Sequence, residues 1–236
     1  MSQIIGTLGF PFITLVFYGW LLFEFKKAIK RSSLEASQQR KIFNRILIAL
    51  IAWAVFVSGW SLSGMMQNFD RFPFNVAPVI LIPFIGIVLF TFSTTAKEIL
   101  LQLKPEAIIR IQFFRFFVEL IIWALFLQKL LPIQMTFEGR NLDIISGISA
   151  PLIAWLLANQ KISKTVVIVW NIACLGLLIN IVTVAILSMP TPAQYFFNEP
   201  YNTAVAKFPY VFLPAFLVPL AYMLHFFSIR QMLIRK

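Results

Sequence analysis

The chain has 236 residues, of which 60% are hydrophobic and 12% are charged, whereas soluble domains average roughly 45–50% and about 25%. A soluble fold of this size would expose very large apolar patches to water, so the composition favours an integral membrane protein with lipid as its solvent. The net charge of +11 does not indicate nucleic-acid binding, because the basic residues lie in short segments between apolar runs and not on one face of a soluble domain.

The chain divides into apolar runs that each come close to the roughly 20 residues needed to cross a bilayer. We therefore predict an all-α, polytopic membrane protein in which residues 1–236 form a single transmembrane domain of seven helices. The fifth run is the shortest, and its beginning is the least well defined. The predicted spans are Ile4–Phe23, Ile42–Ser63, Val76–Ala96, Phe113–Leu131, Leu142–Asn159, Val166–Ser188 and Tyr210–Ile229.

Basic residues are distributed unevenly between the two sides of this arrangement. Of the 20 Lys and Arg, only Arg71, Lys129, Arg140 and Lys207 fall in connections on one side, and the others lie on the opposite side. All the connections are short, so the positive-inside rule applies. It places the N-terminus outside and the C-terminus in the cytoplasm, as expected for a multi-pass protein of a bacterial cytoplasmic membrane.

Several polar residues fall inside the predicted spans. Arg115 and Glu119 are four residues apart on the fourth helix and so share a face, where they can pair. His225 lies at a similar depth on the seventh helix, and Asn159 and Asn171 lie near the inner ends of the fifth and sixth. One interpretation is a cytoplasm-side site that is proton-coupled or accepts an anion. The other is an ion pair with hydrogen bonds that fix helix packing.

A second polar stretch precedes the fifth helix on the outer side and contains Glu138, Arg140, Asn141 and Asp143. Asn141 or Asp143 can cap that helix, because an acidic or amide side chain suits the positive helix end. Alternatively, Arg140 or Glu138 binds a substrate. Glu138 and Asp143 are also the one carboxylate pair that an enzyme acting on lipid would use, although no residue is assigned a catalytic role.

Small residues recur every fourth position along the fifth helix. This spacing makes a groove that a neighbouring backbone approaches closely, either within the chain or in a homo-oligomer. The small residues are Ser146, Ala150, Ala154 and Ala158.

The chain has one cysteine and one histidine, too few for a structural zinc site, and we expect no metal and no cofactor.

Prolines lie in the inward-running helices, with a Pro-x4-Pro spacing at Pro78/Pro83 and Pro214/Pro219. This pattern indicates three helices, a linker helix and three repeated helices, although prolines in first turns are also common. The layout resembles that of the SWEET sugar transporters. The pockets of that family use aromatic-amide pairs, and Trp170-Asn171 in the sixth helix of this chain is such a pair. The second and sixth helices here lack prolines, unlike that family. The segments 135–144 and 225–231 resemble small uncharacterised bacterial membrane proteins.

Three functional hypotheses follow. The first is a transporter of a small polar or anionic solute. The second is a non-transporting sensor or assembly component whose basic inner surface contacts anionic lipid or a partner. The third is a membrane enzyme, which the scarcity of acidic residues and histidine disfavours.

Overall fold

The computed structural model describes the backbone of residues 2–235 and the side chains of residues 7–235. Within that range the chain is helical and contains no β-strand. The α-helices are α1 (Ser2–Arg31), α2 (Ala36–Leu62), α3 (Ala77–Phe92), α4 (Thr94–Gln102), α5 (Pro105–Ile111), α6 (Phe114–Leu127), α7 (Ile144–Ala158), α8 (Lys164–Leu187) and α9 (Val218–Ile234). Short helical turns join them: η1 (Met65–Gln67), η2 (Phe69–Arg71), η3 (Ile133–Met135), η4 (Ala204–Ala206) and η5 (Leu213–Leu217).

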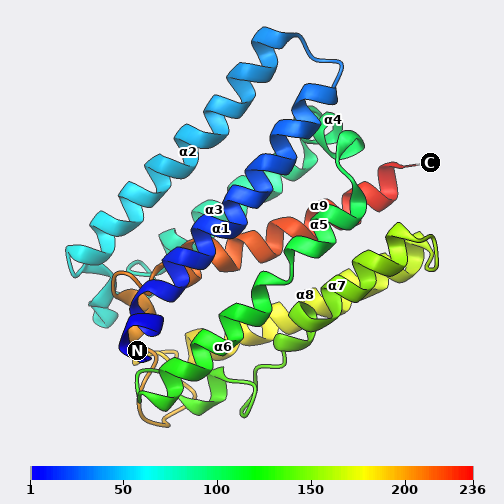
Figure 1. The fold of residues 1–236 in the computed structure, drawn as a ribbon. Helices are drawn as coiled ribbons and strands as arrows, with labels where there is room; N and C mark the ends of the chain where they lie inside the picture. The colour runs from blue at the N-terminus through cyan, green and yellow to red at the C-terminus, as the bar shows by residue number, and fades with distance from the viewer. Residues whose placement is uncertain (1, 236) are drawn as a thin grey trace.

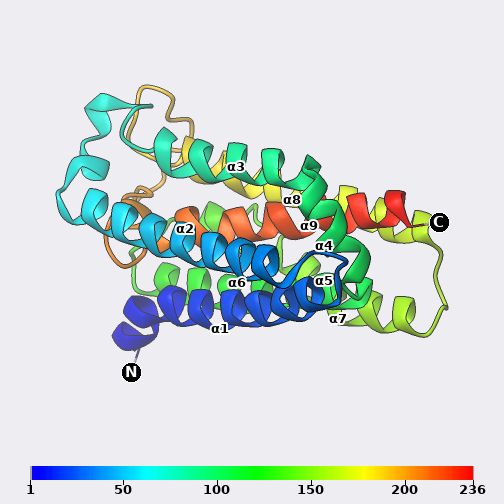
Figure 2. The same ribbon diagram turned by 90° about the horizontal axis from the view of Figure 1, so that it is seen from above.

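The helices run back and forth between two ends of an elongated bundle, with the two termini at opposite ends (Figure 1). The helix α9 lies in the middle, packed against α3, α5 and α8 (Figure 2). The main apolar core is formed by the inner faces of α1, α6, α8 and α9. The helix α2 lies at the edge of the bundle (Figure 1), so most of its surface is available to lipid.

Four described helices are long and apolar enough to cross a membrane, which identifies the chain as an α-helical membrane protein. These are Thr7–Arg31, Ala36–Leu62, Lys164–Leu187 and Leu213–Ile234. The most apolar stretch of Leu213–Ile234 is 61% buried within the chain, whereas that of Ala36–Leu62 is 6% buried. The seventh predicted span is therefore the core of the bundle, and the second is its most lipid-exposed helix.

The predicted third span, 76–96, is not one straight helix. The helix α3 ends at Phe92, and α4 continues at an angle of 73° to it. Ser93 separates the two helices and caps α4, since its hydroxyl accepts from the amide N–H of Ala96 at 3.1 Å. The predicted fourth span, 113–131, is also displaced, because its helical structure begins at Pro105 in α5 and ends at Leu127 in α6.

The end of α9 supplies side-chain hydrogen bonds at both of these helix breaks. Arg230 donates to the carbonyl of Ser93 at 3.0 Å. Gln231 donates to the carbonyls of Leu100 and Leu103 at 2.6 and 2.7 Å, where α4 gives way to α5. Carbonyls without partners are costly in a membrane protein, so Gln231 allows the chain to turn between α4 and α5, whereas the carbonyl of Ser93 also accepts from the backbone N–H of Lys97 at 3.2 Å.

The fifth span is shorter than predicted. The helix α7 has 15 residues, about 22 Å of helix, against a hydrocarbon core of about 30 Å. The preceding irregular segment folds back into the bundle and buries Asn141 completely. Its backbone is paired locally, with the N–H of Asn141 donating to Thr136 at 3.1 Å. Gly139 is required there, because a Cβ would lie 2.3 Å from the carbonyl oxygen of Ile133.

Close helix packing explains the small residues of α7. Ser146, Ala150 and Ala154 are fully buried within the chain, and Ala158 is exposed. At Gly147 a Cβ would lie 2.4 Å from the backbone nitrogen of Phe116. The groove thus packs against α5 and the start of α6 of the same chain.

The turn η5 is π-helical and leads into Pro219, which cannot donate to the carbonyl of Ala215. Trp53 of α2 donates its indole N–H to that carbonyl at 2.9 Å. Tyr18 of α1 donates to the next carbonyl, that of Phe216, at 3.1 Å. Both outer helices are therefore tied to the point where the central helix is distorted.

Candidate functional site

The centre of the bundle contains a buried ion pair. Arg115, in the first turn of α6, is 2% exposed. Its guanidinium contacts Asp143 in a bidentate arrangement, with Nε donating to Oδ2 at 2.7 Å and Nη2 donating to Oδ1. Asp143 precedes α7, so its charge also faces the positive end of that helix. Bidentate arginine–carboxylate pairing is the strongest hydrogen-bonding geometry available to these groups.

His225 of α9 lies on the other side of Arg115. Its Nε2 is 2.6 Å from Nη1 of Arg115. A guanidinium can only donate hydrogen bonds, so Nε2 is the accepting, unprotonated nitrogen. The proton is then on Nδ1, which donates to Oδ1 of Asn171 at 2.8 Å. The geometry therefore holds a neutral histidine, because a proton on Nε2 would put two donors face to face.

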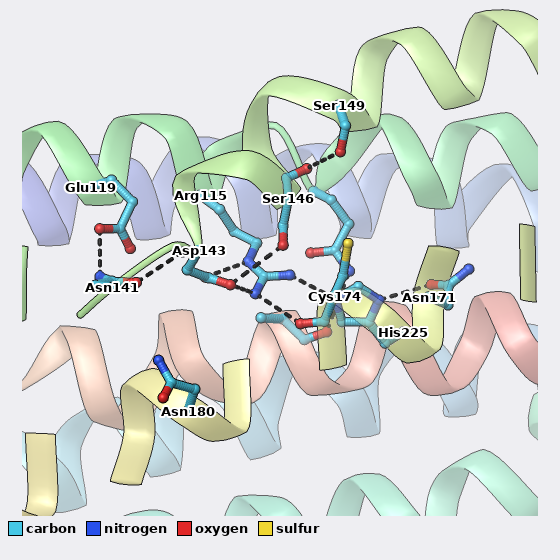
Figure 3. A network of polar contacts seen from close by, with 12 residues as sticks. Arg115, Glu119, Asn141, Asp143, Ser146, Ser149, Asn171, Cys174, Asn180 and His225 are labelled. Atoms are coloured by element: carbon cyan, nitrogen blue, oxygen red, sulfur yellow. Dashed lines mark hydrogen bonds and ion pairs between the residues drawn. The ribbon is translucent and has the colours of Figure 1, made fainter. Parts of the chain in front are cut away.

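The network continues from His225 into α8 and α7. Asn171 donates to the hydroxyl of Ser228 at 2.9 Å. Trp170 packs its ring against His225, with centroids 5.9 Å apart, and donates its indole N–H to Ser149 at 2.9 Å. Figure 3 shows Arg115, His225 and Asn171 following one another through the bundle interior.

Glu119 lies at the other end of this series of groups. Its Oε2 accepts from the amide of Asn141 at 2.5 Å, and Oδ1 of Asn141 accepts from the backbone N–H of Asp143 at 3.0 Å. Asn141 thereby joins Glu119 to the ion pair (Figure 3). Among residues 7–235, the second carboxylate oxygen of Glu119 has no hydrogen-bond partner.

A cavity of about 80 Å³ reaches this cluster, with Arg115, Glu119 and Asp143 at its polar end. The rest of its wall is apolar and is contributed by α3, α6, α8, η5 and α9. Ile80 of α3 and Ile186 of α8, which line it, are partly exposed. The volume is enough for a few water molecules or a small organic group.

The predicted pairing of Arg115 with Glu119 is wrong, since the carboxylate bonded to Arg115 is that of Asp143. The helical segment that carries Glu119 also begins earlier than predicted, because α5 and α6 together run from Pro105 to Leu127. Glu119 is nearer to the Leu127 end than to the Pro105 end. Asn159 is not part of the network: it is exposed and donates to the carbonyl of Trp155 at 2.8 Å.

The polar stretch before α7 divides into two parts. Asn141 and Asp143 are buried in the network, whereas Glu138 and Arg140 are exposed. Glu138 accepts from the indole of Trp123 at 2.8 Å, and Arg140 lies over the ring of Phe196 at 5.1 Å from its centroid. Glu138 and Asp143 therefore have separate partners and do not form a carboxylate pair.

Ser146, Ser149 and Ser228 were not predicted as part of the site. Ser146 donates to Asp143 at 3.4 Å. The short fifth run was the sequence signal that could have joined the two predicted clusters, because a helix too short to cross the hydrocarbon core must begin inside the bundle. Among the described residues, no group of three or more His, Cys, Asp or Glu side chains is arranged to hold a metal ion.

A family model described as a domain of unknown function, DUF8737, matches residues 71–233, well over half of the chain. The chain belongs to the DUF8737 family. The DUF8737 match includes every residue of the buried network, whereas α1 and α2 precede it. No curated protein and no solved structure matches the chain.

Proposed function

We propose that the chain crosses a bacterial cytoplasmic membrane seven times, with the N-terminus outside. The passes are α1, α2, α3, α5 with α6, α7 with the buried segment before it, α8, and η5 with α9. The helices α5 and α6 together provide roughly 34 Å at about 1.5 Å per residue. The basic α1–α2 and α7–α8 connections lie at the same end of the bundle as the C-terminus, as the positive-inside rule requires.

Within this arrangement the protein acts as a transporter of a small amphipathic solute, and Glu119 is the residue that binds it. The observation that carries this proposal is the unpaired carboxylate oxygen of Glu119 at the polar end of an otherwise apolar cavity. Ionisable groups buried in a membrane protein are rare, and they mark solute, ion or proton pathways.

The charges at the cavity favour a solute that donates hydrogen bonds or carries positive charge. The charge of Arg115 is neutralised by Asp143, and its Nη1 faces His225. Among the described residues that line the cavity, no cationic group is left free for an anion, so the anion-accepting version of the site is not proposed. The apolar walls between α3 and α8 suit a short hydrocarbon portion that enters from the lipid side.

Binding can be tested by thermal unfolding of the purified chain with short alkylamines, alkanols and alkanoates of matched length. Amines should stabilise the wild-type chain, and Glu119→Gln should weaken that binding about tenfold or more, since a charge-assisted hydrogen bond contributes roughly 1.5–3 kcal/mol. Glu138→Gln removes the same charge from an exposed position and should bind as wild type does. Stronger stabilisation by alkanoates, or an unchanged response in Glu119→Gln, would contradict the proposal.

Transport is tested separately with the full chain in proteoliposomes. Wild-type vesicles should take up the bound amine faster than empty vesicles, and vesicles containing Glu119→Gln should match empty ones. Binding without any uptake would instead support the second function, a sensor or assembly component. The low burial of α2 favours that alternative, because a nearly bare helix offers a surface to a partner.

A further inference from the structure

A second hollow lies away from the buried network, at the end of the bundle where the basic connections gather. It has a volume of about 280 Å³ and lies between the last turns of α1 and the break between α4 and α5. Trp20 forms part of its wall. Tryptophan is enriched where a membrane protein meets the headgroup region, so the hollow is at headgroup depth in the arrangement proposed above.

The charge around this hollow is unbalanced. Four cations line it, Lys27, Arg31, Lys104 and Arg110, together with the acids Glu24 and Glu106. Within the described part of the chain, the one ion pair among these groups joins Lys27 to Glu24 at 3.5 Å. Three cations from two separate segments thus face the same space without a carboxylate within 4 Å.

Clustered like charges repel one another, and the repulsion is stronger beside a low-dielectric membrane than in water. An anion bound in the hollow would offset this repulsion between the cations. We propose that the hollow between α1 and the α4–α5 break binds the phosphate group of an anionic phospholipid. Basic pockets between helices on the cytoplasmic side are suited to such headgroups, and the acyl chains would extend along the apolar surface of α1. This site is independent of the solute site at Glu119.

The chain provides a matched control for non-specific attraction. Arg40 and Lys41, at the start of α2, lie at the same end of the bundle and are exposed, but they do not line the hollow. Arg31 and Lys104 are also exposed and make no ion pair within the described residues. Replacing either pair with glutamine therefore removes the same charge from the same side without disturbing the core.

The test is native mass spectrometry of the full chain in detergent, titrated with phosphatidylglycerol or with phosphatidylcholine of equal chain length. Each cation near the phosphate should contribute about fivefold to affinity, so Arg31→Gln/Lys104→Gln should weaken phosphatidylglycerol binding roughly 25-fold. Arg40→Gln/Lys41→Gln should change it by less than about threefold. Arg31→Lys/Lys104→Arg, which conserves charge, should retain binding.

Three results would overturn the assignment. Equal losses in the two glutamine pairs would mean general attraction to the basic end. Phosphatidylcholine binding as tightly as phosphatidylglycerol would exclude selection for an anionic lipid. Displacement of the lipid by equimolar inorganic phosphate would identify a site for a soluble anion. Retention of phosphatidylglycerol in the presence of inorganic phosphate, weaker binding of phosphatidylcholine, and loss in Arg31→Gln/Lys104→Gln alone would support the proposal.

Discussion

Replacing Asp143 with asparagine should destabilise the protein more than any other single carboxylate-to-amide change. The substitution leaves the guanidinium of Arg115, which is 2% exposed, without its carboxylate. The remaining partners of that guanidinium are His225 and the carbonyl of Cys174 at 3.5 Å, and neither carries negative charge in the observed arrangement. Removing one member of a buried ion pair costs about 3–5 kcal/mol.

For a chain of this size the loss corresponds to a decrease in Tm of roughly 6–20 °C. The assay is thermal unfolding of the purified protein in one detergent, with Glu119→Gln as the matched comparison. That variant should unfold near the wild-type temperature, because the new amide oxygen can still accept from Asn141. The double variant Arg115→Gln/Asp143→Asn should recover most of the stability, since no charge is then left unpaired.

The reasoning would be refuted if Asp143→Asn unfolded at the wild-type temperature. It would also be refuted if Glu119→Gln were the more damaging change, because Arg115 would then depend on Glu119. A double variant as unstable as Asp143→Asn would show that the lost hydrogen bonds, and not the unpaired charge, account for the effect.

Two further substitutions test the packing around the site by the same unfolding assay. Gly147→Ala should lower the free energy of unfolding by about 1–3 kcal/mol, because its Cβ would overlap the backbone of α6. Gly176→Ala, which has open space around it, should not destabilise the protein. Equal effects of the two substitutions would contradict the close approach of α7 to α6. Trp53→Phe should lower the free energy of unfolding by about 1–2 kcal/mol by leaving the carbonyl of Ala215 unpaired. The half-exposed Trp155 should tolerate the same change. Unaltered stability of Trp53→Phe would show that the hydrogen bond from Trp53 to Ala215 is dispensable.

The membrane class could be predicted from composition alone, because apolar content and run length are properties that lipid selects directly. Several helix ends could not. At Ser93 and Leu103 the helix breaks receive hydrogen bonds from Arg230 and Gln231, which are more than a hundred residues away. A sequence window records the local hydropathy but not those distant donors, so the bend after Phe92 was predicted as continuous helix.

The candidate site shows the same division between local and tertiary information. Arg115, His225 and Asn171 were predicted to converge because polar groups in a membrane seek one another. The partner of Arg115 was assigned to Glu119 because helical spacing is the one geometry that sequence displays. Asp143 was placed at the outer surface, because the return of the segment before α7 into the bundle depends on tertiary packing around Asn141.

The arrangement of the whole chain depends on an odd number of membrane crossings, which is tested directly by short epitope tags at the two termini. In cells with the outer membrane removed, antibody should label the N-terminal tag while the cytoplasmic membrane is intact. The C-terminal tag should become accessible only after that membrane is permeabilised. Labelling of both tags, or of neither, before permeabilisation would place the termini on one side and contradict the seven-span account.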